Sequence, residues 1–148
     1  MEYSEFIEIV ERVKKRKPLL FGLDFDNAPG TGEIADFEEK YGIVLPEKYK
    51  QFLMEYGGGY FGFANIYSLD ESSDFYIMHP RNNSGNMIGG LLHIADNGCG
   101  DYYAFGITNG RCDDTVLFCE HDGGGAVTCR YSDVLEYLVS EGLKEEFV

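Results

Sequence analysis

Three glycines, Gly57, Gly59 and Gly62, have the G-x-G-x-x-G spacing of dinucleotide-binding loops. That loop binds a pyrophosphate when a strand precedes the glycines and a helix follows, because the N–H groups at the helix start contact the phosphates. Here a helical pattern precedes the glycines and an aromatic strand pattern follows. We therefore expect no dinucleotide and no other cofactor.

Metal-binding patterns are incomplete. The segment 24–27 begins like a calcium-binding EF-hand loop, but Ala28 stands at the next ligand position and no glutamate occupies the twelfth. His79, His93 and His121 are too far apart to form a metal-binding pair on one helix. Aspartate, histidine and cysteine do alternate between residues 93 and 121, so a metal site is an alternative. We expect no metal site.

Covalent catalysis has no clear candidate. Cys99 falls in an expected exposed turn, but the neighbouring charges of Asp96 and Asp101 disfavour a thiolate. A Gly-x-Ser-x-Gly nucleophile motif is absent from the sequence, and no pair of carboxylates can be assigned to acid and base roles. We expect no catalytic residues and interpret the protein as a binding module, not an enzyme.

The charge of the chain limits its partners. Twelve basic and 26 acidic side chains leave a formal net charge of −14. Coulomb repulsion disfavours binding to nucleic acid or to an anionic membrane, and favours a basic protein partner. The simpler alternative is that the acidity only keeps the protein soluble.

A protein-binding surface would combine exposed tyrosines with surrounding carboxylates, because tyrosine buries a large area at a low entropy cost. The nominated residues are Tyr60, Asp70, Glu71, Asp74, Asp96, Asp101, Tyr102, Tyr103, Asp113 and Asp114. The alternative for each is a tyrosine in the core or an acid on a solvated rim. Because neighbouring strand residues point to opposite faces, at most one of Tyr102 and Tyr103 can be core in a sheet buried on one side.

Helices are predicted for the first third of the chain. Ser4 is a suitable cap for the first, which stops before Pro18, and two more follow within residues 33–56. Apolar residues at positions 34, 37 and 41 lie on one helical face, and Gly42 is a suitable left-handed terminus. Pro46 then opens a helix with an apolar stripe at positions 49, 52, 53 and 56.

After Gly59 the pattern changes to short apolar or alternating runs, which indicate strands. The expected strands are Tyr60–Ile66, Phe75–Met78, Leu91–Ala95, Tyr102–Ile107, Val116–Cys119 and Ala126–Tyr131. The polar segment 81–86 predicts a flexible loop. Ser132 is a suitable cap for a closing helix over residues 132–139.

The order of helix, glycine, Leu-Pro, aromatic helix and glycine turn resembles the opening signature of the SUKH superfamily. The matching residues are Glu38, Gly42, Leu45, Pro46, Tyr49, Phe52, Leu53, Gly57 and Gly58. Residues 92–105 and 132–139 are similar to a second and a third block of that family. The resemblance, together with the strand pattern, implies an α+β fold in which N-terminal helices and a C-terminal helix pack on a single antiparallel or mixed sheet of about five to six strands.

The superfamily includes bacterial toxin-immunity proteins and fungal cell-wall synthesis regulators. The resemblance therefore implies a protein that neutralises a basic toxin domain of the nuclease or deaminase type by direct binding. A regulatory scaffold of the cell-wall or glucan-synthesis type is the alternative, and an uncharacterised enzyme or small-ligand binder is the second. The class and identity of the toxin, the face that binds it and the oligomeric state stay open at this point.

Length and hydropathy predict the domain organisation and the cellular location. A chain of 148 residues can bury one core, so we expect a single domain over residues 1–148. No apolar run reaches the roughly 20 residues of a membrane helix, and Glu2, Glu5 and Glu8 do not fit a signal peptide. These features predict a cytoplasmic protein in which the four cysteines are reduced.

Overall fold

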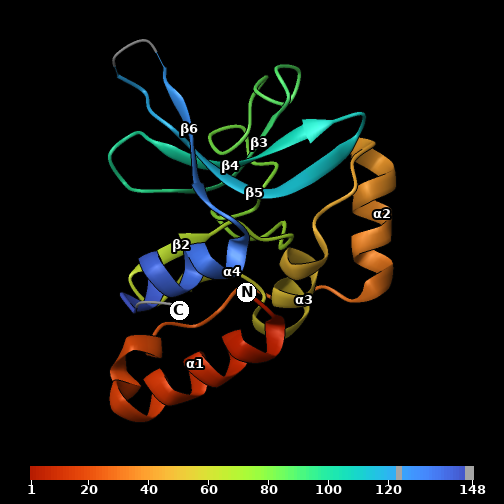
Figure 1. Cartoon of the computed structure of the whole chain (residues 1–148). Coiled ribbons are helices and arrows are strands. Elements are labelled where there is room, and N and C mark those ends of the chain that lie inside the picture. The colour runs from red at the N-terminus through yellow and green to blue at the C-terminus, as the bar shows by residue number, and fades with distance from the viewer. Residues whose placement is uncertain (123–124, 146–148) are drawn as a thin grey trace.

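The computed structural model describes residues 1–122 and 125–145 (Figure 1). The helical first third comprises α1 (Tyr3–Arg16), the 3-10 helix η1 (Pro18–Phe21), α2 (Thr31–Tyr41) and α3 (Glu47–Tyr56). The strands are β1 (Gly59–Phe61), β2 (Ala64–Ile66), β3 (Leu91–Asp96), β4 (Tyr102–Thr108), β5 (Arg111–Cys119) and β6 (Val127–Tyr131). The short helix α4 (Val134–Tyr137) continues into the π-helical segment η2 (Leu138–Leu143). None of the helices in the described part is long and apolar enough to span a membrane.

The expected α+β class is confirmed, with one difference in the sheet. The six strands of the described residues form two antiparallel sheets, a β1–β2 hairpin and a four-stranded sheet in the order β3-β4-β5-β6. The sheets meet where Tyr67 N donates to Ile94 O at 2.7 Å and Asp96 N donates to the side-chain Oδ1 of Asn65 at 3.0 Å. Because a side-chain amide takes the place of a backbone partner, the ladder is interrupted and the expected single sheet becomes two.

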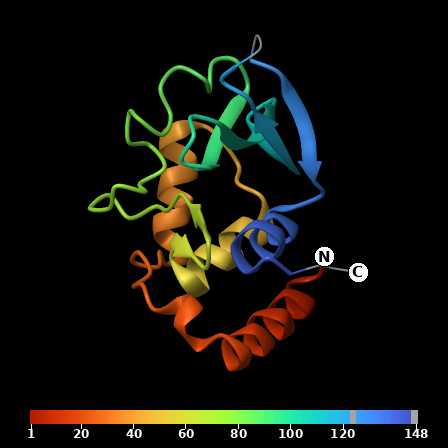
Figure 2. The same cartoon turned by 90° about the vertical axis from the view of Figure 1, so that its left-hand side faces the viewer.

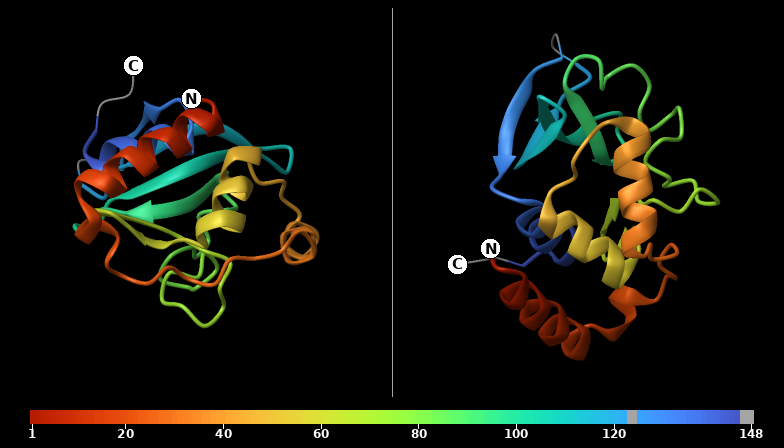
Figure 3. Two further views of the ribbon diagram at one scale, coloured as in Figure 1. Left: turned by 90° about the horizontal axis from the view of Figure 1, so that it is seen from below. Right: turned by 90° about the vertical axis from the view of Figure 1, so that its right-hand side faces the viewer.

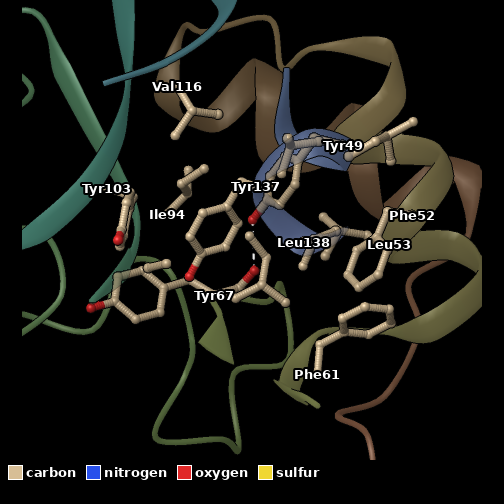
Figure 4. Close-up of a cluster of buried hydrophobic side chains, with 14 of the residues drawn as sticks. Tyr49, Phe52, Leu53, Phe61, Tyr67, Ile94, Tyr103, Val116, Tyr137 and Leu138 are labelled. Atoms are coloured by element: carbon tan, nitrogen blue, oxygen red, sulfur yellow. Dashed lines mark hydrogen bonds between the residues drawn. The ribbon is translucent and has the colours of Figure 1, made fainter. Parts of the chain in front are cut away.

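Helices cover one face of the four-stranded sheet. Figures 1 and 2 place α1 at the end of the molecule farthest from this sheet, with α3 and α4 between them. Helix α2 stands to one side of the sheet (Figure 3). The core between these layers is strongly aromatic, and its largest fully buried side chains include Tyr49, Phe52, Phe61, Tyr67 and Tyr137 (Figure 4).

The buried tyrosines keep hydrogen-bond partners, as burial of a hydroxyl requires. Tyr49 donates to Tyr67 O at 2.7 Å, and Tyr137 donates to Asn65 O at 2.9 Å. Tyr67 donates to Asp96 Oδ2 at 2.8 Å. These three bonds connect α3, α4 and β3 to the segment around β2.

The predicted helices are confirmed, although α1 begins at Tyr3 after Glu2, so the prediction of Ser4 as its cap was wrong. Helix α2 ends at Gly42 with a φ of 65°, in the left-handed region that favours glycine, and α3 follows Pro46. The closing helix is capped by Asp133, whose Oδ1 accepts from Glu136 N at 2.9 Å. The prediction of Ser132 as the cap was wrong by one residue, although Ser132 N donates to the Glu136 carboxylate at 2.9 Å. The two contacts together make a reciprocal cap.

Residues 67–90 differ most from the expected pattern. Phe75–Met78 is not a strand, and only Tyr76 forms an isolated bridge, with Ser68. Figure 2 shows the segment as long loops that leave β2 and return to β3. Ile77 is nevertheless fully buried, so the apolar pattern predicted burial correctly without a strand. A short apolar run does not by itself distinguish the two outcomes.

The polar segment 81–86 is held against the edge of β3. Asn83 Nδ2 donates to Ile77 O at 2.8 Å and to His93 O at 2.9 Å, while its Oδ1 accepts from His93 N at 2.8 Å. Asn86 Nδ2 donates to Leu91 O at 2.7 Å. The Asn83 side chain thus occupies the place of a peptide group in a neighbouring strand. Asn82 and Asn83 are buried, a feature that the prediction of a flexible loop missed.

Replacing Asn83 by alanine is expected to lower the free energy of unfolding by about 1–3 kcal/mol, because His93 would lose partners for both its backbone groups. The Asn83→Asp variant should be similarly destabilised, since it retains the shape but lacks the donors to Ile77 O and His93 O. Urea unfolding at neutral pH measures both changes. A loss below 0.5 kcal/mol in both variants, on the order of a surface substitution, would contradict this role.

Candidate functional site

A cleft of about 300 Å³ opens where the β1–β2 turn, the end of β3 and η2 meet. We call it the tyrosine–carboxylate cleft, and its walls include Phe63, Asn65, Asp96, Tyr103, Tyr137 and Glu141. Figure 4 shows the hydroxyl ends of Tyr67, Tyr103 and Tyr137 gathered on one side of the core. The cleft therefore has aromatic walls and polar oxygens within one hollow.

Close packing of two glycines next to the cleft positions its residue Phe63. Gly62, with a φ of 60°, forms the turn between β1 and β2, and a Cβ at this position would overlap the carbonyl oxygen of Gly142 in η2. Phe63 N donates to that same oxygen at 2.8 Å. The turn and η2 consequently fix Phe63 at the rim, where its side chain is 65% exposed.

Asp96 is held in place by its neighbours. Besides the Tyr67 hydroxyl, its carboxylate accepts from Gly98 N at 3.0 Å and from Asn65 Nδ2 at 3.4 Å. Asn65 also accepts from Asp96 N, so the two side chains are fixed relative to each other. The end of β3 therefore presents a carboxylate in a defined orientation.

Glu141 supplies the second carboxylate from η2. Its Oε1 accepts from the Tyr131 hydroxyl at 2.8 Å, and its Oε2 lies 3.5 Å from Lys144 Nζ. Burial, followed by the charge of Glu141, raises the pKa of Tyr103 to about 12. Tyr103 therefore stays protonated at neutral pH and can act as a donor within the cleft.

Four of the residues nominated from sequence lie in β3, β4 and the loop between them, and two of these four line the cleft. Asp96 and Tyr103 line it. Asp101 lies in the following loop, where His121 and Asn97 donate to its carboxylate and lower its pKa to about 2. Tyr102 extends from the opposite face of β4 and stacks on His93 with 4.2 Å between ring centroids. Of the adjacent tyrosines, Tyr103 is thus the core residue and Tyr102 is partly exposed.

The other six nominated residues lie elsewhere. Tyr60 is exposed on β1 and its ring packs against Phe75 with 4.9 Å between centroids. Asp70 and Glu71 line hollows beside α2, which also contain Glu33. Asp74 forms an exposed ion pair with Arg81.

Asp113 and Asp114 lie apart from these residues, exposed on β5 beside Pro46 and Lys48. The nominated set is therefore divided among several separate places. Chain order alone does not reveal this division, because it depends on which loop ends at which sheet edge.

Phe63, Asn65 and Glu141 were missed by sequence reasoning. Phe63 was read as an interior residue of one strand over 60–66, although Gly62 before it was a signal for a turn. Glu141 lies beyond the predicted closing helix, which continues as η2 for four residues past position 139. A change from α-helical to π-helical geometry leaves no 3.6-residue repeat of apolar residues, so the sequence pattern does not reveal the segment.

Histidine, cysteine and acidic side chains are dispersed over the described residues. Within that part of the chain, no three histidine, cysteine, aspartate or glutamate side chains come together as a metal site. Burial, with the Asp113 charge second, raises the pKa of Cys112 to about 12, which keeps this thiol protonated.

Comparison with known families fits this architecture. A model of the SMI1 / KNR4 family (SUKH-1) matches residues 29–140. The chain belongs to the SMI1 / KNR4 family. The SUKH-1 match covers α2, α3 and all six strands, and it ends one residue before Glu141. Proteins of the SUKH-1 family are generally non-enzymatic and bind other proteins. A search of curated proteins finds no match to this SUKH-1 protein.

Proposed function

We propose that this SUKH-1 protein is an immunity protein that binds and neutralises a basic toxin domain. The observation that carries the proposal is Phe63, an exposed aromatic ring at the rim of a cleft with carboxylates on two walls. An apolar anchor surrounded by polar groups is typical of the energetic centre of a protein interface. Family membership supports a protein partner, and the physical character of the surface supports a basic one.

Charge supports the same partner. With a net charge of −14, the protein repels nucleic acid and anionic membranes and attracts a basic domain over long range. Carboxylates can also occupy a basic cleft where a nuclease binds phosphate, which would block its substrate. In this proposal residues 1–148 act as one cytoplasmic binding domain, without a cofactor and without a reaction of its own.

The test is titration against the toxin domain encoded by the neighbouring gene. Phe63→Ala is expected to weaken binding by about 10- to 30-fold, because a central aromatic anchor contributes about 1.4–2 kcal/mol or more. Ile88→Ala removes a side chain that is 95% exposed and outside the cleft, so it is the matched control and should bind like the unchanged protein. Calorimetry at low and high salt should show weaker binding in high salt.

Equal binding by the Phe63 and Ile88 variants would reject the cleft as the contact surface. No binding to the toxin, together with capture of cell-envelope synthesis proteins, would replace the immunity role with the regulatory-scaffold role. Toxicity assays in cells that carry both genes complete the test, since neutralisation must be lost together with affinity.

A further inference from the structure

We infer that the tyrosine–carboxylate cleft binds the guanidinium group of an arginine side chain from a protein partner. The inference rests on the proposed function only for the source of the arginine. The chemistry comes from Asp96 and Glu141, which face one hollow from two different elements. A planar cation between two carboxylates can accept charge-assisted hydrogen bonds on both sides.

The two carboxylates retain capacity for such a ligand. Three donors from Tyr67, Asn65 and Gly98 share the two oxygens of Asp96, which together offer about four acceptor sites. Glu141 Oε1 has the Tyr131 hydroxyl, whereas the contact to its Oε2 is the 3.5 Å approach of Lys144. Glu141 is 27% exposed, so a ligand can reach it from solvent.

Lys144 places a cation among the residues that line the cleft, three positions after Glu141. Lys144 lines the cleft, is the one cationic side chain among the lining residues that the structure describes, and directs its ammonium to Glu141. It is 56% exposed, and its backbone has a φ of 57°, which is uncommon for a residue other than glycine. This exposed ammonium therefore occupies part of the site and can be displaced.

The walls favour arginine over lysine. Phe63 and Tyr103 provide aromatic rings on which a guanidinium can stack, and the Asn65 and Asp96 oxygens are fixed in orientation. The flexible ammonium of a lysine would gain the attraction to the carboxylates, but it would make neither the planar stacking nor the paired hydrogen bonds. The cleft volume of about 300 Å³ also accommodates a side chain and not a folded segment.

The test uses small probes, so that it does not depend on the toxin. N-acetyl-arginine-N-methylamide is titrated into the 15N-labelled protein, alongside the citrulline analogue, which has nearly the same shape but no charge. The arginine probe should shift the amide resonances of Gly98, Asn65 and Glu141 with a dissociation constant at least tenfold lower than that of citrulline. The lysine probe should fall between them.

Two variants make the result specific to the cleft. Glu141→Gln should weaken binding of the arginine probe by about tenfold, and Lys144→Met should strengthen it two- to fivefold, since the internal competitor is removed. Asp36→Asn, an exposed acid on α2 outside the cleft, is the control and should leave the affinity unchanged. Amide spectra of the free variants establish that each is folded.

Equal shifts by arginine and citrulline, or an unchanged affinity in Glu141→Gln, would overturn the inference. Unchanged amide resonances at the cleft on addition of the arginine probe, together with intact toxin binding, would reject the arginine site and leave the immunity function in place. Arginine binding without any toxin binding would support the arginine site and reject the immunity function.

Discussion

Gly62→Ala is expected to lower the free energy of unfolding by about 2–5 kcal/mol. A left-handed conformation costs a residue with a Cβ about 1–2 kcal/mol, and forced overpacking adds about 1–3 kcal/mol. Both costs apply here, because φ at Gly62 is 60° and the new Cβ would overlap the backbone oxygen of Gly142. That oxygen cannot move away without breaking its hydrogen bond to Phe63 N.

Gly42→Ala is the matched control. Its φ of 65° is nearly the same, but nothing lies within 4 Å of the added Cβ, so only the conformational cost of about 1–2 kcal/mol applies. Urea or thermal unfolding of the two variants separates strain from overlap. If both lose the same stability, the overlap with Gly142 O is relieved at no cost, and the close approach of the β1–β2 turn to η2 does not require a glycine on steric grounds.

Asp133→Ala is expected to cost about 3–5 kcal/mol at neutral pH, the usual loss when one partner of a buried ion pair is removed. The Asp133 side chain is 5% exposed, and its Oδ2 accepts from the Met1 ammonium at 2.8 Å and from Lys48 Nζ at 3.0 Å. Its Oδ1 caps α4. The Asp36→Ala variant removes an exposed acid and should stay within 0.5 kcal/mol of the unchanged protein, on the order of other surface substitutions.

The pH dependence distinguishes charge from packing at Asp133. Burial would raise its pKa, but the bonds from the Met1 ammonium, Glu136 N and Lys48 outweigh it and hold the pKa below the ordinary 3.8. A depressed pKa stabilises the folded state above the unfolded value and loses that contribution as pH falls through the folded value. The stability gap between the unchanged protein and Asp133→Asn should therefore persist from about pH 7 to pH 4 and shrink below that. A gap that stays constant down to about pH 2 would exclude an electrostatic origin.

Local signals in the sequence accounted for the helices and most strands. Gly42, Pro46 and Gly57 mark backbone conformations that few other residues adopt, so their positions translate directly into helix boundaries. The apolar runs of β3 and β4 were equally informative, although burial on β4 covers the three consecutive residues Tyr103 to Phe105 and does not alternate. Val116–Cys119 was too short a prediction for β5, whose first residues pair with the segment around Val44. That pairing joins residues 67 positions apart and leaves no local pattern, but the Asn109-Gly110 turn before β5, with φ values of 51° and 76°, is a local hairpin signal that the prediction missed.

The candidate site was less predictable for the same reason. Asp96 and Tyr103 could be nominated by type, but their proximity to Glu141 depends on η2 reaching the β1–β2 turn. Asn83 and Asn65 look like ordinary loop and strand-end residues, and only the fold shows that their amides replace backbone partners. Asp113 and Asp114 share the composition of the site but not its location.

The cleft draws its walls from positions 63, 96 and 141, which are far apart along the chain and adjacent only after folding. An unfolded chain therefore has no such site, and a ligand of the cleft binds the native state alone. By mass action, a partner present at one hundred times its dissociation constant would add about 2.7 kcal/mol to the stability of the protein. The complex would accordingly resist proteolysis longer than the free protein, and the level of this protein in a cell would follow the level of its partner.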